Sequence, residues 1–292
     1  MTLPLAEQVT MITGASRGFG RALAHAYWRA GSSLIITARN SAALSELTSE
    51  LERAGGARHQ KIIPVTRDLA EHRTPSDLIS TAESCFGCLD TLVVNAAVQG
   101  PVGRLWETDV EKWREALILN LAVPAALCAE AARLMVRQQS GTIIAISGGG
   151  ATAPRPRFSS YAAAKAGLVR LIETLARELE GTGVTANAIA PGAMATDMLR
   201  DVLRTGPDAA GTKECADAAR VLSEGDMTME RACDLAVFLA TAAGSRVSGR
   251  LISAVWDRWE DWPAHAAQLD GSDLYTLRRV TGRDRGQTWG DY

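Results

Sequence analysis

Short apolar runs alternate with longer segments of helical spacing along most of the chain. The runs are continuously or nearly continuously apolar, as strands covered on both faces of a parallel sheet are. They lie at residues 9–13, 33–38, 61–66, 91–95, 142–147 and 184–190, with a late one at 251–255. Helical spacing marks 18–31, 41–54, 75–87, 109–138, 158–180 and 229–242. The alternation predicts an α/β fold: a doubly wound parallel sheet of about seven strands with helices on both faces.

No repeat or low-complexity linker divides the chain, so we expect one domain over residues 1–255 and a tail over 256–292. The tail contains four of the seven tryptophans, namely Trp256, Trp259, Trp262 and Trp289. The first three recur every three residues, which would align them on one face of a helix despite Pro263. Such large side chains are costly to leave in water, so we expect the tail to pack on the domain or on a neighbouring subunit.

Composition excludes several classes of protein. Lys+Arg 31 against Asp+Glu 33 gives a net charge of −2, which argues against a nucleic-acid binder. The longest uncharged helical stretch, 116–129, has 14 residues, short of the ~18 of a membrane span. The first residues show no secretion signal, and five cysteines without regular spacing indicate reduced thiols. We therefore expect a cytoplasmic protein, and scattered histidines predict no metal site.

A glycine-rich segment, Thr13-Gly14-Ala-Ser-Arg-Gly18-Phe-Gly20, joins the first strand to the first helix. Gly14 permits a tight turn, Gly18 lets the backbone approach a pyrophosphate, and Gly20 lets helix and strand pack closely. The helix N-terminus adds free N–H groups and a positive partial charge. This is a variant of the dinucleotide-binding fingerprint in its required strand–helix context.

The end of the second strand indicates which dinucleotide binds. NAD sites place an acidic residue there, whereas this chain has Ala38-Arg39-Asn40. Arg39 suits a 2′-phosphate, and Arg17 could clamp it from the other side. Two solvated surface arginines remain the alternative. We expect NADP(H) to be preferred, with NAD(H) possible.

Tyr161 and Lys165 lie four residues apart on a predicted helix and therefore share one face. A neighbouring ammonium favours the phenolate, so we expect the pKa of Tyr161 to lie below its usual ~10. Tyr161 could then act as an acid or base near neutral pH.

Taken in order, the motifs resemble those of the single-domain short-chain dehydrogenase/reductase family, which has a Rossmann-type fold. They are the glycine loop, Val94-Asn95-Ala96-Ala97, Asn120, Tyr161 with Lys165, and Asn187-Ala-Ile-Ala-Pro191-Gly192, and the likeness runs from about residue 9 to 255. The resemblance implies that Tyr161 exchanges a proton with the substrate oxygen and that Lys165 binds the nicotinamide ribose. It also implies that Asn120 links Lys165 to solvent through a proton relay.

By the same resemblance, the Asp68-Leu69 pair contacts adenine and Thr196 holds the nicotinamide amide. We expect the cofactor to contact Gly14, Ser16, Arg17, Gly18, Phe19, Gly20, Arg39, Asn40, Asp68, Leu69, Asn95, Ala96, Ala97, Tyr161, Lys165, Pro191, Gly192, Ala193 and Thr196.

Pro124 gives the Asn120 relay separate support. It lies four residues after Asn120 and has no N–H, so it leaves the carbonyl of Asn120 free and should kink the helix. That carbonyl could hold a relay water near Lys165. A plain proline kink is the alternative.

The chain departs from the family at the catalytic serine. That serine stands thirteen residues before the tyrosine, where this chain has Gly148. Ser147 is one residue early, and neighbouring strand residues face opposite ways. Ser147 could still serve as a substitute catalytic serine if the strand end is twisted, or bulged by Gly148-Gly149-Gly150. Losing a donor at a developing oxyanion costs roughly 10²–10³ in rate.

These observations predict an NADP(H)-dependent oxidoreductase that interconverts an alcohol and a ketone or aldehyde. The alternative is a cofactor-binding protein with weak or no redox activity. Arg155 and Arg157 should lie beside the substrate pocket and hint at an anionic substrate, although solvated surface arginines are equally consistent. Residues 193–228 should form the substrate lid. Helices that are apolar on several sides predict a homodimer or homotetramer.

Overall fold

The computed structural model describes residues 3–224 and 227–289. Seven strands form one sheet in the order β3-β2-β1-β4-β5-β6-β7, and every neighbouring pair is parallel. The strands are β1 (Val9–Thr13), β2 (Ser33–Ala38), β3 (Ile62–Thr66), β4 (Thr91–Val94), β5 (Gly141–Ile146), β6 (Val184–Ala190) and β7 (Leu251–Ser253). The sequence prediction of an α/β doubly wound sheet is confirmed.

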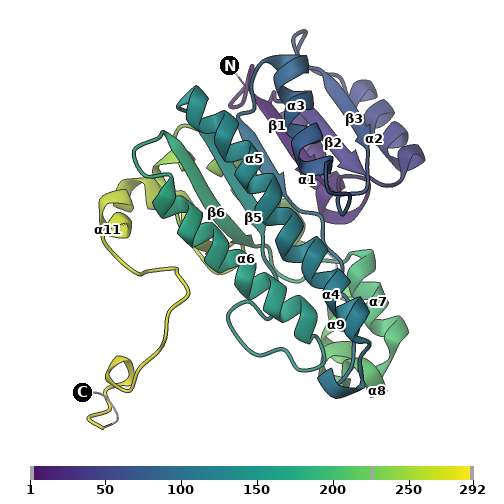
Figure 1. Ribbon diagram of the computed structural model, residues 1–292, viewed down its shortest axis with the longest axis vertical. Helices are drawn as coiled ribbons and strands as arrows, with labels where there is room; N and C mark the ends of the chain where they lie inside the picture. The colour runs from purple at the N-terminus through teal and green to yellow at the C-terminus, as the bar shows by residue number, and fades with distance from the viewer. Residues whose placement is uncertain (1–2, 225–226, 290–292) are drawn as a thin grey trace.

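Helices cover both faces of the sheet (Figure 1). They are α1 (Gly18–Arg29), α2 (Ser41–Arg53), α3 (Thr74–Phe86), α4 (Val110–Leu117), α5 (Val123–Gln138), α6 (Ser159–Glu178), α7 (Asp197–Thr205), α8 (Pro207–Ala210), α9 (Thr212–Glu224), α10 (Met227–Leu239) and α11 (Ala266–Asp270). One apolar core lies between the sheet and α1, α2 and α10. A second lies between the sheet and α3, α5 and α6.

The helix that contains Asn120 and Pro124 changes its winding at the predicted position. Between α4 and α5, residues Ile118–Ala122 form a π-helical turn. Pro124 occupies the first turn of α5, where the absence of its N–H costs least. A π-turn is one of the standard ways in which a helix accommodates such an interruption.

The stretch Val110–Gln138 is 29 residues long and has the length and composition of a membrane-spanning helix. The sequence expectation on length was wrong, because it counted only the uncharged part. The apolar side chains Leu127, Leu134 and Met135 are buried in the second core. The core helix of a water-soluble protein has this same composition.

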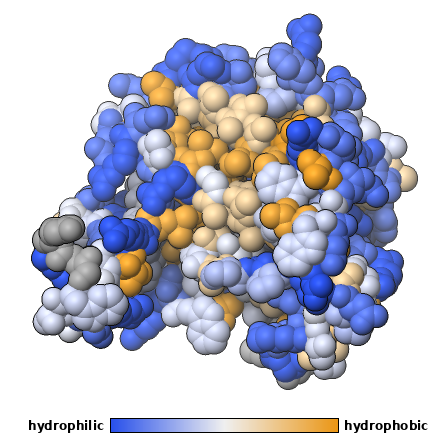
Figure 2. Space-filling view, turned by 60° about the horizontal axis from the view of Figure 1, so that its bottom comes forward, coloured by the Kyte–Doolittle hydropathy of each residue, from blue (hydrophilic) through white to orange (hydrophobic). Residues whose placement is uncertain are grey.

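One side of this stretch nevertheless faces solvent. Ile118 is 47% exposed, and Ala122, Ala126 and Ala129 follow it on the same side of the helix. Figure 2 shows apolar residues gathered across the middle of one face of the molecule and bordered by hydrophilic ones. Single exposed apolar residues are ordinary, but a contiguous patch marks a surface suited to a partner.

The tail is divided between buried and exposed parts. Trp259 and Trp262 lie in the first core, in a 3₁₀ turn over Trp259–His265. Trp256 is 86% exposed, so the expectation that all three indoles share one buried face was wrong. Trp256 precedes the helical turn and therefore does not follow its spacing. Beyond α11 the chain descends apart from the helices, at the left of Figure 1.

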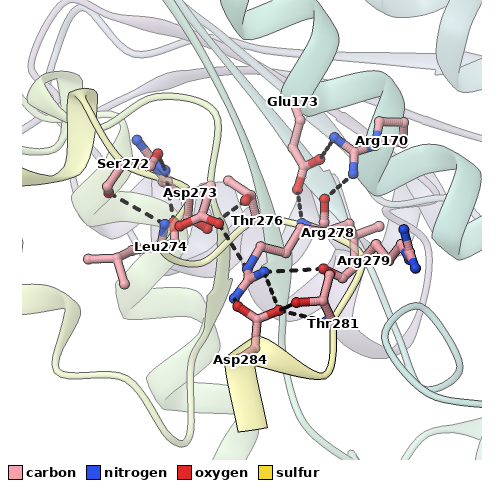
Figure 3. Close-up of polar contacts among 12 residues, drawn as sticks. Arg170, Glu173, Ser272, Asp273, Leu274, Thr276, Arg278, Arg279, Thr281 and Asp284 are labelled. Carbon is pink, nitrogen blue, oxygen red and sulfur yellow. Dashed lines mark hydrogen bonds and ion pairs between the residues drawn. The ribbon is translucent and has the colours of Figure 1, made fainter. Parts of the chain in front are cut away.

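Polar contacts fasten the tail to α6 and to the edge of the sheet. The N–H of Leu277 donates to Oε1 of Glu173 at 2.6 Å, and Arg170 donates to the carbonyl of Leu277. Figure 3 shows Glu173 and Arg170 of α6 directed toward the tail. The N–H of Leu251 in β7 donates to the carbonyl of Tyr275 at 2.8 Å. The tail therefore continues the hydrogen bonding of the sheet past its last strand.

Candidate active site

The carboxyl ends of all seven strands meet at one edge of the sheet, because every neighbouring pair is parallel. The strand order reverses between β1 and β4, which is where doubly wound sheets bind their ligands. Residues 14–20 follow β1, 95–97 follow β4, 147–148 follow β5 and 191–193 follow β6. The fold thus gathers the predicted motifs at this edge.

Steric limits explain the glycines of the loop after β1. Gly14 has φ +67°, and a Cβ on it would lie 2.9 Å from Cα of Ala96. A Cβ on Gly20 would run into the carbonyl oxygen of Gly14 and the side-chain amide of Asn95. Gly18 has φ +53° and lies against the Thr196 methyl group, 3.3 Å from where its Cβ would be. Side chains at these positions would fill the cradle or strain its backbone.

A hydroxyl joins the two strands that flank the cradle. Oγ1 of Thr13 accepts from the backbone N–H of Asn95 at 3.0 Å and of Ala96 at 3.1 Å. The Asn95 side chain donates to the carbonyl of Thr13 at 2.9 Å. These bonds fix the carboxyl ends of β1 and β4 relative to each other.

The start of α1 is suited to an anion. Arg17 occupies the N-cap position without a capping side-chain bond, and the first turn contains no acidic residue. The N–H groups of that turn and the helix dipole therefore remain available to a phosphate. Ser16 lies in the loop, and Phe19 is buried in the first core at 5% exposure. Together with the glycine cradle, these residues fit a dinucleotide.

The residues expected around the adenosine half lie at the ends of β2 and β3. Arg39 is exposed, whereas the Asn40 side chain accepts from the N–H of Ala43 and caps α2. Asp68 accepts from the N–H of Ala70 at 3.0 Å, and Leu69 beside it is buried. Arg39 is thus accessible to a ligand at this end of the site.

Arg17 is engaged by another part of the chain. Its guanidinium lies 3.4 Å from Asp197, the first residue of α7, and Asp197 also pairs with Arg200 at 2.9 Å. Because Arg17 is 74% exposed, this contact is weak and can be exchanged for a phosphate at small cost.

The segment after β6 approaches the cradle from the opposite side. Pro191 directly follows β6. Gly192 has φ +90°, and a Cβ on it would lie 2.8 Å from the Val255 side chain. The carbonyl of Ala193 accepts from Thr228 at 2.9 Å. Thr196, which touches Gly18, is therefore held within reach of whatever occupies the cradle.

Tyr161 and Lys165 are both buried near the N-terminus of α6, at 8% and 2% exposure. Nζ of Lys165 donates to the carbonyl of Ile146 at 2.6 Å and lies 5.6 Å from the centre of the Tyr161 ring. Burial lowers the pKa of Lys165 to about 8. Lys165 is thus fixed beside Tyr161 by the carboxyl end of β5.

The expected lowering of the Tyr161 pKa is wrong. Burial raises this pKa, and the nearby charge of Arg155 offsets the effect in part. The i, i+4 spacing predicted correctly that the Lys165 cation lies beside Tyr161. It carries no information on how far Tyr161 is buried, and burial disfavours the charged phenolate.

Asn120 is fully buried in the π-helical turn. Its side chain accepts from the N–H of Val98 at 2.9 Å and donates to the carbonyl of Val98 at 2.7 Å. This pair of bonds braces the loop after β4, which includes Ala97. The side chain therefore has a structural task of its own.

Gly148 lies directly against Tyr161. A Cβ at Gly148 would run into the tyrosine hydroxyl and would lie 3.1 Å from Cζ of the ring. Ser147 is 3% exposed, its N–H donates to the carbonyl of Ile189 at 2.7 Å, and its hydroxyl has no partner within the described residues. The Tyr161 hydroxyl therefore occupies the space that a serine at position 148 would need.

The two arginines of the 148–158 loop bind the helices of the expected lid. Arg155 forms an ion pair with Glu214 of α9 at 2.7 Å, and Arg157 donates to the carbonyls of Asp208 and Ala209 in α8. The interpretation as solvated surface arginines is wrong, and their protein partners remove the hint of an anionic substrate. Sequence reasoning missed Glu214 because it lies 59 residues from Arg155.

Comparison with known proteins agrees with this geometry. A sequence model of the short chain dehydrogenase family matches residues 8–206. A 3-oxoacyl-(acyl-carrier-protein) reductase from Synechocystis is 36% identical over 200 residues, 68% of this chain and 78% of that protein. An NADPH-dependent aldehyde reductase-like protein, chloroplastic, from Arabidopsis thaliana is 34% identical over 209 residues, 68% of this chain and 77% of that protein.

A solved structure extends the likeness to most of the chain. It is a protein from Beutenbergia cavernae assigned as an NAD(P)-dependent gluconate 5-dehydrogenase, with NADP bound at low occupancy. The TM-score is 0.76 at 30% identity, covering 87% of this chain and 97% of that one. The fold and the relatives are those of NAD(P)-dependent oxidoreductases that act on small molecules. The chain belongs to the short-chain dehydrogenase/reductase family.

Proposed function

We propose that this protein is an NADP(H)-dependent oxidoreductase that interconverts an alcohol and a ketone or aldehyde. One observation carries the proposal: Tyr161 and Lys165 are buried together at the end of β5, on the same sheet edge as the glycine cradle. A buried proton donor beside a dinucleotide site has the parts that carbonyl reduction needs.

The chain's own residues would divide the work as follows. The glycine cradle and the start of α1 hold the pyrophosphate, and Thr196 and Lys165 hold the nicotinamide half. When bound, the cofactor supplies or accepts the hydride. Tyr161 gives its proton to the substrate oxygen during reduction, and the Lys165 ammonium stabilises the resulting phenolate.

The direct test follows NADPH absorbance in the presence of a panel of activated ketones and aldehydes. Steady oxidation of NADPH that depends on the carbonyl compound supports the proposal. Tight NADPH binding without turnover on any member of the panel favours the alternative, a cofactor-binding protein. Gly148 supports that alternative. In the short-chain dehydrogenase/reductase family the serine at this position positions the substrate oxygen, and Gly148 has no hydroxyl.

The cofactor preference gives a second test. Arg39 is exposed at the end of β2 with no acidic residue beside it in sequence, and the Arabidopsis relative is described as NADPH-dependent. A charge-assisted contact contributes ~1.5–3 kcal/mol, so NADPH should bind at least about tenfold more tightly than NADH. Arg39→Asp should reverse the order in a fluorescence titration. Equal affinities in the unmodified protein would contradict the assignment.

Lys165 predicts a pH dependence for the reductive reaction. Its pKa of about 8 lies within the accessible range, and the charged form is the one that stabilises the phenolate. At limiting NADPH, kcat/KM reports the free enzyme, so it should be level below pH 8 and fall about tenfold per pH unit above it. Lys165→Arg retains its charge throughout and should remove this fall. A wild-type profile that stays level to about pH 10 would rule the assignment out.

We also propose that the exposed apolar side of the helix over Val110–Gln138 is covered by a second subunit in a homodimer or homotetramer. Ile118 with Ala122, Ala126 and Ala129 supports this proposal. A cytoplasmic location remains an expectation from composition.

A further inference from the structure

Arg155 is a partly buried cation beside the proposed proton donor. Its guanidinium carbon lies 4.0 Å from the centre of the Phe158 ring and 5.9 Å from that of Tyr161. The aliphatic part of the side chain passes over the loop, 3.8 Å from where a Cβ on Gly149 would be. A positive charge therefore lies close to the Tyr161 ring and against Gly149, the residue that follows Gly148.

Glu214 holds this cation in one orientation. Nε of Arg155 donates to both carboxylate oxygens at 3.1 and 3.2 Å, and a terminal nitrogen donates to one of them at 2.7 Å. The two side chains are 19% and 31% exposed. A two-pronged pair of this kind fixes the plane of the guanidinium.

We propose that Arg155 is a positioning residue for Tyr161, held in place by Glu214 of α9, and that its charge assists the proton donor in a site without the usual serine. The inference rests on the proposed function, since it assigns Arg155 a role in that same site. Arg155 favours the phenolate that Tyr161 becomes when it gives up its proton.

Charged side chains from three elements surround the Tyr161 ring or its neighbour Arg155. Lys165 lies on the same helix, Arg155 on the preceding loop, and Glu214 on α9 opposes Arg155. Burial raises the pKa of Tyr161, and the charge of Arg155 lowers it. Burial alone would make Tyr161 a weaker acid, and the nearby charge of Arg155 offsets part of that effect.

Arg155 could also act only by anchoring helices α7–α9, and the test must distinguish that structural role from its electrostatic effect on Tyr161. Phe158 is fully buried in a small apolar cluster with Val202, Ala210 and Ala218, which joins the loop to those helices. Arg157 anchors α8 through the carbonyls of Asp208 and Ala209 and, within the described residues, makes no cation–ring contact with Tyr161, as Arg155 does. Arg157→Gln is therefore the matched control.

The test measures the ionisation of Tyr161 by NMR of protein labelled at tyrosine Cζ, with the signal assigned by its loss in Tyr161→Phe. In Arg155→Leu the phenolate fraction at a given alkaline pH should fall about tenfold, because a nearby cation favours the charged form by at least this much. In Glu214→Gln it should rise, because the charge opposing Arg155 is gone. Arg157→Gln should leave it unchanged.

The rate of carbonyl reduction provides a second measurement. Arg155→Leu should lower kcat for carbonyl reduction about tenfold, and Arg155→Lys should restore much of it. The exchange Arg155→Glu with Glu214→Arg retains the ion pair but places a negative charge beside Tyr161, so it should not restore either quantity. Restoration by the exchange, or a Tyr161 ionisation that no variant changes, would overturn the inference.

The NMR measurement needs no turnover, which separates the two proposals. If no carbonyl compound is reduced but the ionisation responds as expected, the proposed function fails and the assignment of Arg155 to Tyr161 stands. If reduction is normal and the ionisation does not respond, the assignment fails alone.

Discussion

Replacing Tyr161 with Phe is expected to abolish measurable carbonyl reduction while leaving NADPH affinity nearly unchanged. A positioned general acid contributes typically about 10²–10⁴ in rate, and this substitution removes the acid while keeping the ring. Burial of the ring beside Lys165 means that its packing is retained. The measurements are kcat from NADPH absorbance and Kd from fluorescence titration.

Tyr27→Phe is the matched control, because Tyr27 is also a buried tyrosine. Its hydroxyl donates to the carbonyl of Ala236 at 2.6 Å, in the core between α1 and α10. Its loss should cost about 0.5–1.5 kcal/mol of stability and leave kcat intact. Full activity in Tyr161→Phe would contradict the catalytic assignment and favour the cofactor-binding alternative.

The fold could be predicted because its strands are short, apolar and buried on both faces. The strands predicted over 9–13, 33–38 and 184–190 have the bounds that the structure shows. Helices α7, α8, α9 and α11 were missed. Helix α7 is short and polar, and it is stabilised by packing of Val202 against Phe158 from a distant loop. Local spacing carries no signal for such a contact.

Some features of the candidate site could likewise be predicted from local sequence, whereas others depend on tertiary packing. The roles of Gly14 and Gly20 follow from excluded volume, which a motif in its strand–helix context encodes. The proton affinity of Tyr161 depends on burial and on Arg155, and the pairing of Arg155 depends on Glu214. Those are properties of tertiary packing. The contact between Gly148 and the Tyr161 hydroxyl is likewise visible only once strand β5 and helix α6 are placed together.

Trp262→Ala should destabilise the protein strongly, although the residue lies outside the predicted domain of residues 1–255. Trp262 is 6% exposed in the first core, and its ring centre lies 4.2 Å from that of Tyr275. Truncating a buried Trp costs about 3–5 kcal/mol, which for a chain of this size lowers Tm by roughly 6–20 °C. Differential scanning calorimetry measures the shift.

Trp256→Ala is the control, since its side chain is 86% exposed and should change stability by no more than about 0.5 kcal/mol. Arg250 also binds the tail: it is 3% exposed and donates to the carbonyls of Ser272 at 3.0 Å and Leu274 at 2.8 Å. Truncation after Val255 would remove these acceptors together with the buried indoles of Trp259 and Trp262, so it should prevent stable folding. Equal melting of Trp256→Ala and Trp262→Ala would show instead that residues 256–289 are an appendage whose contacts contribute nothing to the stability of the sheet.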